Sequence, residues 1–140
     1  MIRYKTLLVA LCMLMPALAM ADDENARITP LLTTTETIAG QPIVVPAHPK
    51  LQAMMFTIAP GQSLPIHKHP YIRYAYVEKG ALDVTLVDQK KTLHFKAGDF
   101  FAEAIDAWHY GTNNGKVPVE LLIIDQMPQD VESNTVKQAR

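Results

Sequence analysis

Cysteine is nearly absent from this sequence. Its 140 residues contain one cysteine, Cys12, which lies in an apolar stretch near the N-terminus. One thiol makes no disulfide within the chain, and it does not build a cysteine cage for zinc or for an iron–sulfur cluster. Any metal held by the folded part of the chain must therefore be bound mainly by nitrogen or oxygen atoms.

An excess of charge of either sign is also missing. The sequence has 13 basic and 14 acidic residues, a formal net charge of −1. A nucleic-acid-binding protein normally carries a basic face or stripe, so no nucleic-acid partner is expected. The single long apolar stretch, residues 6–18, is interrupted by Pro16 and is shorter than the about 20 residues that span a bilayer.

The N-terminal stretch has the features of a secretory signal peptide. Arg3 and Lys5 precede it, and an Ala-Met-Ala tripeptide at positions 19–21 supplies the small-x-small pattern of a cleavage site. Residues 1–21 are therefore predicted to direct export to the periplasm, with no membrane association after their removal. A retained N-terminal anchor is the alternative.

The remainder of the chain has the pattern of many short β-strands. Segments rich in β-branched and aromatic residues are separated by Pro, Gly, Asn or Asp, and apolar residues alternate most clearly at Leu82, Val84 and Leu86. Many strands of this length indicate one all-β domain, a sandwich or a closed barrel, and we favour a jelly-roll barrel over residues 28–127. Flexible ends are expected at residues 22–27 and 128–140. The predicted strands are 28–38, 42–45, 51–59, 63–69, 71–78, 81–88, 91–96, 99–104, 107–113 and 117–125.

Three histidines form the most informative pattern. His67 and His69 are one residue apart on a predicted strand, where such positions point to the same face. His109 lies on another predicted strand. Three imidazoles around one divalent ion would leave coordination positions for water or substrate. A hydrogen-bonded histidine cluster without metal is the alternative.

The histidines stand at fixed distances from several other residues. One group is Gly61, His67, His69 and Gly80, and a second is Gly98, His109 and Asn113. These two groups resemble the two motifs of the cupin superfamily. The resemblance implies a single-domain cupin-type jelly-roll β-barrel that holds one divalent transition metal (Fe, Mn, Zn, Ni or Cu).

The sequence departs from the family pattern where a metal-binding glutamate is common, because Arg73 stands there. At about 7 Å and an effective dielectric constant near 20, a divalent ion and a guanidinium repel by roughly 5 kcal/mol. Glu103 is the candidate to offset this repulsion, as an ion-pair partner of Arg73 or as a fourth metal ligand. Arg73 is alternatively a substrate-binding residue that holds a carboxylate in a two-pronged contact. The simplest interpretation is that Arg73 and Glu103 are both solvated charges at the barrel mouth.

A second substrate-binding candidate is Tyr110, which follows His109 among aromatic residues that could line a pocket. The sequence thus predicts an exported metal-binding protein, in the first place a small metalloenzyme acting on an anionic organic molecule. The family resemblance implies oxygenase-like chemistry with iron, whereas zinc, manganese or nickel would favour Lewis-acid chemistry. The alternative is a non-catalytic periplasmic module that binds or senses a small molecule or a metal. An exposed strand edge would allow a homodimer.

Overall fold

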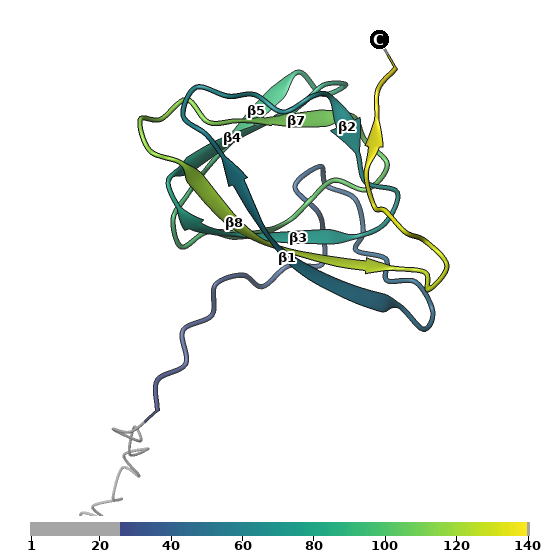
Figure 1. The fold of residues 1–140 in the computed structure, drawn as a ribbon. Coiled ribbons are helices and arrows are strands. Elements are labelled where there is room, and N and C mark those ends of the chain that lie inside the picture. Colours follow the sequence, from purple (N-terminus) through teal and green to yellow (C-terminus); the bar gives the residue numbers. More distant parts are fainter. Residues whose placement is uncertain (1–25, 140) are drawn as a thin grey trace, which may run out of the picture.

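Two antiparallel sheets face each other and enclose an interior space (Figure 1). The computed structural model describes residues 26–139, so the predicted signal peptide lies outside the described residues. Within 26–139 the structure has strands and no helix, and therefore no helix that could cross a membrane. The predicted all-β jelly-roll barrel is confirmed.

The sheets bring distant parts of the chain together. One has the strand order β1-β8-β3-β6 and the other β5-β4-β7-β2-β9, with antiparallel pairing throughout. The strands are β1 (Lys50–Ile58), β2 (His67–Lys68), β3 (Arg73–Lys79), β4 (Ala81–Leu86), β5 (Lys91–Lys96), β6 (Phe100–Ala102), β7 (His109–Thr112), β8 (Val119–Met127) and β9 (Val136–Lys137).

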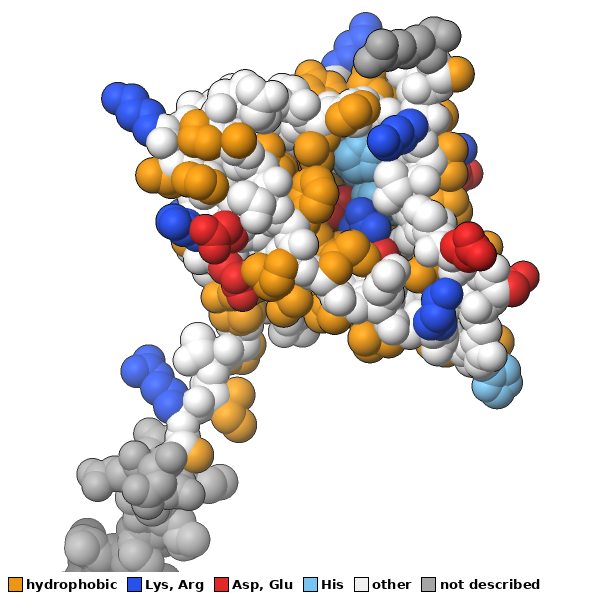
Figure 2. Space-filling view, viewed as in Figure 1, with side chains coloured by type: hydrophobic (Ala, Val, Ile, Leu, Met, Phe, Trp, Pro, Cys, Tyr) orange, Lys and Arg blue, Asp and Glu red, His pale blue; other side chains and the backbone are white. Residues whose placement is uncertain are grey.

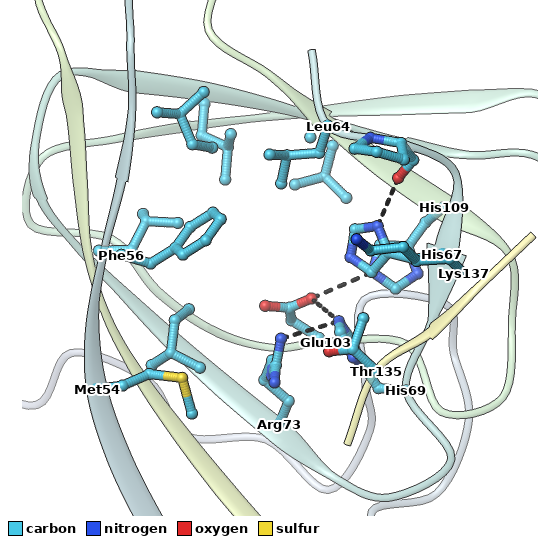
Figure 3. A pocket seen from close by; sticks show the side chains of 17 residues that line it. Met54, Phe56, Leu64, His67, His69, Arg73, Glu103, His109, Thr135 and Lys137 are labelled. Atoms are coloured by element: carbon cyan, nitrogen blue, oxygen red, sulfur yellow. Dashed lines mark hydrogen bonds and ion pairs between the residues drawn. The ribbon is translucent and has the colours of Figure 1, made fainter. Parts of the chain in front are cut away.

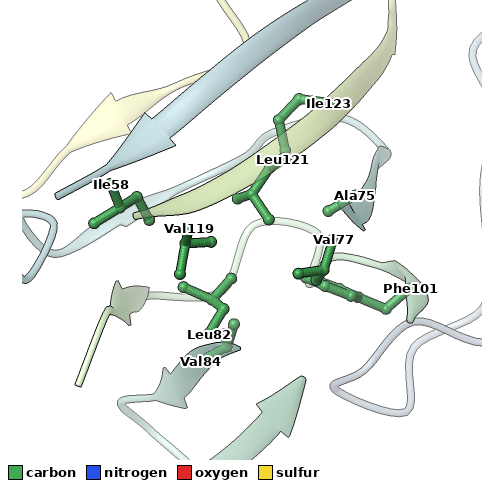
Figure 4. Close-up of a cluster of buried hydrophobic side chains, with 9 residues drawn as sticks. All are labelled: Ile58, Ala75, Val77, Leu82, Val84, Phe101, Val119, Leu121 and Ile123. Carbon is green, nitrogen blue, oxygen red and sulfur yellow. The ribbon is translucent and has the colours of Figure 1, made fainter. Parts of the chain in front are cut away.

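Alternation along the strands places the core between the sheets. In β8, every second residue from Val119 to Met127 is buried, as expected for a strand with one face turned to the interior. Burying one such aliphatic side chain contributes about 1.5–3 kcal/mol. The core cluster, drawn in Figure 4, consists of Ile58, Ala75, Val77, Leu82, Val84, Phe101, Val119, Leu121 and Ile123.

The turns predicted from glycine have the backbone that only glycine adopts easily. Gly80, between β3 and β4, has φ of +80°, and a Cβ built there would lie 2.8 Å from the carbonyl oxygen of Pro118. Gly98 has φ of +93° before β6. Both positions therefore require glycine for conformation, and Gly80 also requires it for space.

Both ends of the predicted barrel differ in the structure. Residues 28–38 and 42–45 form one isolated bridge, between Glu36 and Pro42, instead of strands. Prolines at positions 30, 42 and 46 have no amide hydrogen to donate to a ladder, which is why β-branched content alone misled the prediction. At the other end, the segment predicted as a flexible tail contributes β9, which pairs with β2.

Candidate metal centre

Three imidazoles meet on the inner face of one sheet, as the sequence predicted. His67 begins β2, His109 begins β7, and the two residues are direct partners in the antiparallel register. His69 follows β2 and bridges to Ile105. The ring centroids are 4.9 Å apart for His67–His69, 4.6 Å for His67–His109 and 4.9 Å for His69–His109. Figure 3 shows the three rings around one point on the cavity wall.

Backbone carbonyls set the tautomer of each ring. A carbonyl oxygen accepts hydrogen bonds and never donates them, so an imidazole nitrogen facing one must carry the proton. All three rings use Nδ1 in this way, which leaves Nε2 with its lone pair, the form in which histidine binds a metal. The contacts are His67 to Pro65 at 2.7 Å, His69 to Asn134 at 2.6 Å and His109 to Ala107 at 2.8 Å.

Glu103 joins two of these nitrogens. Its Oε2 lies 3.1 Å from Nε2 of His69 and 3.2 Å from Nε2 of His109. Burial alone would raise the pKa of the Glu103 carboxyl. The charge of His69 and the hydrogen bonds with His109 and His69 outweigh burial, and the charge of Arg73 adds to them, so the pKa lies well below its usual value. Burial likewise lowers the pKa of His109, and the hydrogen bond and charge of Glu103 reverse that effect and raise it. A carboxylate and an imidazole lone pair attract each other only through a shared cation, either a proton or a metal ion.

His67 stands apart from this ion-paired group. Burial is the main cause that lowers its pKa to about 4. The hydrogen bond to Pro65 raises the pKa, and the neighbouring His109 and His69 lower it. The ring is therefore neutral at pH 7. Nε2 of His67 could therefore bind a metal ion without first losing a proton.

Arg73 pairs with Asp125 and not with Glu103, the partner that the sequence suggested. Its Nε donates to Oδ1 and its Nη2 donates to Oδ2 of Asp125, both at 2.7 Å. The two residues are direct partners in the register of β3 and β8. This two-pronged pair cancels the charge that would repel a divalent ion. Nη1 of Arg73 faces the centre and donates to Nε2 of His69 at 3.4 Å.

The sequence held a signal for Asp125 that was not used. Counting every second residue of β8 places Asp125 on the inward face, where it follows Val119, Leu121 and Ile123. An acidic residue at an inward position of an otherwise apolar strand needs a cationic partner. Arg73 was the cationic residue that the prediction should have paired with Asp125.

A cavity of about 310 Å³ opens beside the histidines. Figure 2 shows it as a hollow in one face of the molecule, with histidine, basic and acidic side chains in its depth and hydrophobic side chains along its wall. Thr135 and Lys137 from the C-terminal segment also line it. Tyr110 does not, because it alternates with His109 and Gly111 on β7 and points to the other face. The structure therefore places Tyr110 outside the predicted substrate site.

The donor set fits a divalent transition ion. One nitrogen from each histidine lies within 4.8 Å of the others. Neighbouring ligand atoms on one ion, each bound at about 2.1 Å, are separated by about 3 Å, which matches the spacing of the Glu103 oxygen from its two histidines. Neutral imidazole nitrogens with one carboxylate oxygen suit Fe, Mn, Zn, Ni or Cu, and do not choose among them.

Comparison with known proteins identifies the family. The Cupin domain model matches residues 54–125, 72 of the 140 residues. The chain therefore belongs to the cupin family, and the sequence resemblance is confirmed. No curated protein matches the sequence.

Three solved structures show the same fold. The polyketide cyclase RemF of Streptomyces resistomycificus is 18% identical, with a TM-score of 0.55, over 67% of this chain and 63% of the cyclase. The Lactobacillus farciminis oxalate decarboxylase, solved as a formate complex, is 26% identical, with a TM-score of 0.54, over 62% of this chain and 26% of the decarboxylase. The cupin domain of Schizosaccharomyces pombe Cnp3 is 19% identical, with a TM-score of 0.52, and 61% of each chain is covered. The cyclase and Cnp3 likenesses show the fold alone, and this chain spans about a quarter of the decarboxylase.

Replacing Asp125 with alanine should destabilise the protein strongly. The change leaves the Arg73 guanidinium buried without its partner, and breaking a buried pair in this way costs about 3–5 kcal/mol. The free energy of unfolding from urea titration, without added metal, measures the effect. The control is Glu120→Ala, which removes a surface ion pair with Lys79 at 3.2 Å and should cost less than about 1 kcal/mol. Equal losses for the two variants would show that the Asp125 pair has no special role.

Proposed function

We propose that this protein is an exported cupin that holds one divalent transition metal on His67, His69 and His109, with Glu103 as fourth ligand, and that it is an enzyme acting on a small anionic organic molecule. The observation that carries the proposal is the convergence of three Nδ1-protonated imidazoles on one point. When bound, the metal would supply Lewis-acid chemistry or, if it is iron, chemistry with dioxygen.

The charge balance of the site favours an anionic guest. The Arg73–Asp125 pair is neutral and the imidazoles are neutral, so Glu103 offsets only one of the two positive charges of a divalent ion. Lys137 adds a further positive charge at the cavity, because it is the register partner of His67 on the neighbouring strand. Nη1 of Arg73 remains as a hydrogen-bond donor to an anionic group held at the centre.

The cavity wall favours an apolar part in the same guest. Across from the histidines it is built from apolar side chains, among them Met54 and Phe56 (Figure 3). A volume near 310 Å³ is at the low end for small-molecule sites. A small carboxylic acid with a hydrocarbon part would match the positive charge of the site, the apolar cavity wall and the cavity volume. The likeness to an oxalate decarboxylase solved with formate supports carboxylate chemistry on this scaffold.

One observation keeps a second function in view. If Glu103 is a metal ligand, the cavity-lining residues offer no other carboxylate to serve as a free general base. Asp125, which does not line the cavity, is held by Arg73. A periplasmic module that binds a carboxylate or a metal without turnover would need none. Binding without product formation in the experiments below would favour that function.

Export is inferred from the signal-peptide features of residues 1–21. Cleavage after Ala21 would give a chain that begins at Asp22. We expect the protein to be recovered in the periplasmic fraction of a bacterial host with the mass of residues 22–140. A full-length mass in the cytoplasmic fraction would contradict export.

The metal assignment predicts one metal equivalent in protein purified without an affinity tag. His67→Ala, His69→Ala and His109→Ala should each weaken the metal by more than the 10–100-fold that loss of an outer partner typically costs. Elemental analysis and competition titration with a chelator measure this. His94→Ala is the matched control, because His94 is an exposed histidine paired with Asp83 on the surface. Metal content that survives all three site variants would remove the assignment.

The guest class can be tested with simple probes. In Co(II)-loaded protein, benzoate should perturb the visible spectrum at lower concentration than acetate, because its ring buries apolar surface, and neutral benzamide should not compete. Lys137→Met should weaken benzoate by about fivefold, the value of roughly 1 kcal/mol for an exposed ion pair. Lys116→Met, which changes an exposed lysine outside the cavity lining, is the control. Equal affinity for benzoate and benzamide would exclude an anion-selective site.

A further inference from the structure

The C-terminal segment, residues 133–138, lies along the strand that begins with His67. Val136 pairs with Lys68 and Lys137 pairs with His67, and the amide of Gln138 donates to the carbonyl of Ile66 at 3.0 Å. Figure 1 shows β9 beside β2 at the edge of the second sheet. The segment is thus a further strand of the sheet that carries the metal centre.

Asn134 is the buried residue of this segment. The residue is 2% exposed, and its side chain bonds both backbone groups of Tyr71. Its Oδ1 accepts from the Tyr71 amide at 2.9 Å, and its Nδ2 donates to the Tyr71 carbonyl at 3.1 Å and to Oδ1 of Asp125 at 2.8 Å. One amide group therefore fixes the segment to the chain after His69 and to the Arg73–Asp125 pair.

The backbone carbonyl of the same residue orients His69. It accepts from Nδ1 of His69 at 2.6 Å. The corresponding carbonyls for His67 and His109 come from Pro65 and Ala107, each two residues before its histidine. His67 and His109 are thus oriented by residues just before their own strands, whereas His69 is oriented by a residue 65 positions away.

We propose that Asn134 is a positioning residue: docking of residues 133–138 through its side chain fixes the tautomer and orientation of His69, and so makes a complete metal centre conditional on a closed C-terminal segment. The part of this inference that concerns metal rests on the proposed function. By thermodynamic reciprocity, a segment that strengthens metal binding must itself be held more firmly when metal is bound. The segment also carries Thr135 and Lys137 on the cavity wall, so its docking completes the cavity as well.

The first experiment compares Asn134→Ala with Ser133→Ala, an exposed neighbour whose hydroxyl only accepts from the Thr135 amide. In metal-free protein, NMR of the imidazole protons should show His69 Nδ1–H exchanging with solvent at least tenfold faster in Asn134→Ala, while His109 Nδ1–H is unchanged. Zn(II) affinity should fall 10–100-fold, the usual effect of losing an outer partner. Ser133→Ala should match the wild type within twofold in both measurements. Wild-type values for Asn134→Ala would overturn the proposal.

The second experiment uses the wild-type chain and so does not depend on a variant that folds. Without metal, one opening of the segment should expose the His69 Nδ1–H, the Tyr71 amide and the Gln138 amide together, so their exchange should be equally protected within about threefold. A protected His69 proton beside a freely exchanging Gln138 amide would overturn the proposal. Saturating Zn(II) should slow exchange of the Tyr71 and Gln138 amides at least tenfold more than that of Val84 in the core. If the wild type binds no Zn(II), the proposed function fails, and the metal-free comparisons still decide the role of Asn134.

Discussion

Three backbone carbonyls control what this site can bind. Each holds the proton of one imidazole on Nδ1, so the Nε2 lone pairs of His67, His69 and His109 all face the same point. Without these contacts each ring would exchange between tautomers and rotamers, and three neutral nitrogens would meet only occasionally. The ligand arrangement is therefore a property of the backbone around the histidines as much as of the histidines themselves.

The same requirement explains the pairing around Arg73. The guanidinium of Arg73 would repel a divalent ion unless a neighbouring anion neutralised it. Asp125 supplies that anion as the direct register partner of Arg73 on β8. Glu103 is then available to the histidines. The strand register thus decides which acid meets which basic group. Asp125 on β8 pairs with the guanidinium of Arg73 on β3, and Glu103, the residue after β6, contacts the imidazoles.

How much of this could be predicted from sequence depends on how far apart the partners lie. Local patterns were sufficient to predict the barrel and the approach of His109 to His67 and His69. These patterns are the strand periodicity, the glycine turns and the i, i+2 spacing of His67 and His69. Asp125 was within reach, because its inward parity on β8 follows from the same alternation. Asn134 was not, since a polar residue in a polar tail gives no sign that its carbonyl lies 2.6 Å from a histidine 65 positions earlier.

The cavity shows that the interior of the barrel is not packed for stability alone. Ile58, Leu82, Val84, Leu121 and Ile123 belong to the core cluster and also line the cavity, so one apolar layer serves both. A barrel selected only for stability would fill such a space with larger side chains, because an empty volume forfeits dispersion contacts and costs about 24 cal/mol per Å³ in buried cases. The space is retained next to the polar cluster, on a wall completed by a short C-terminal strand. A guest that brings its own apolar surface would recover those lost contacts.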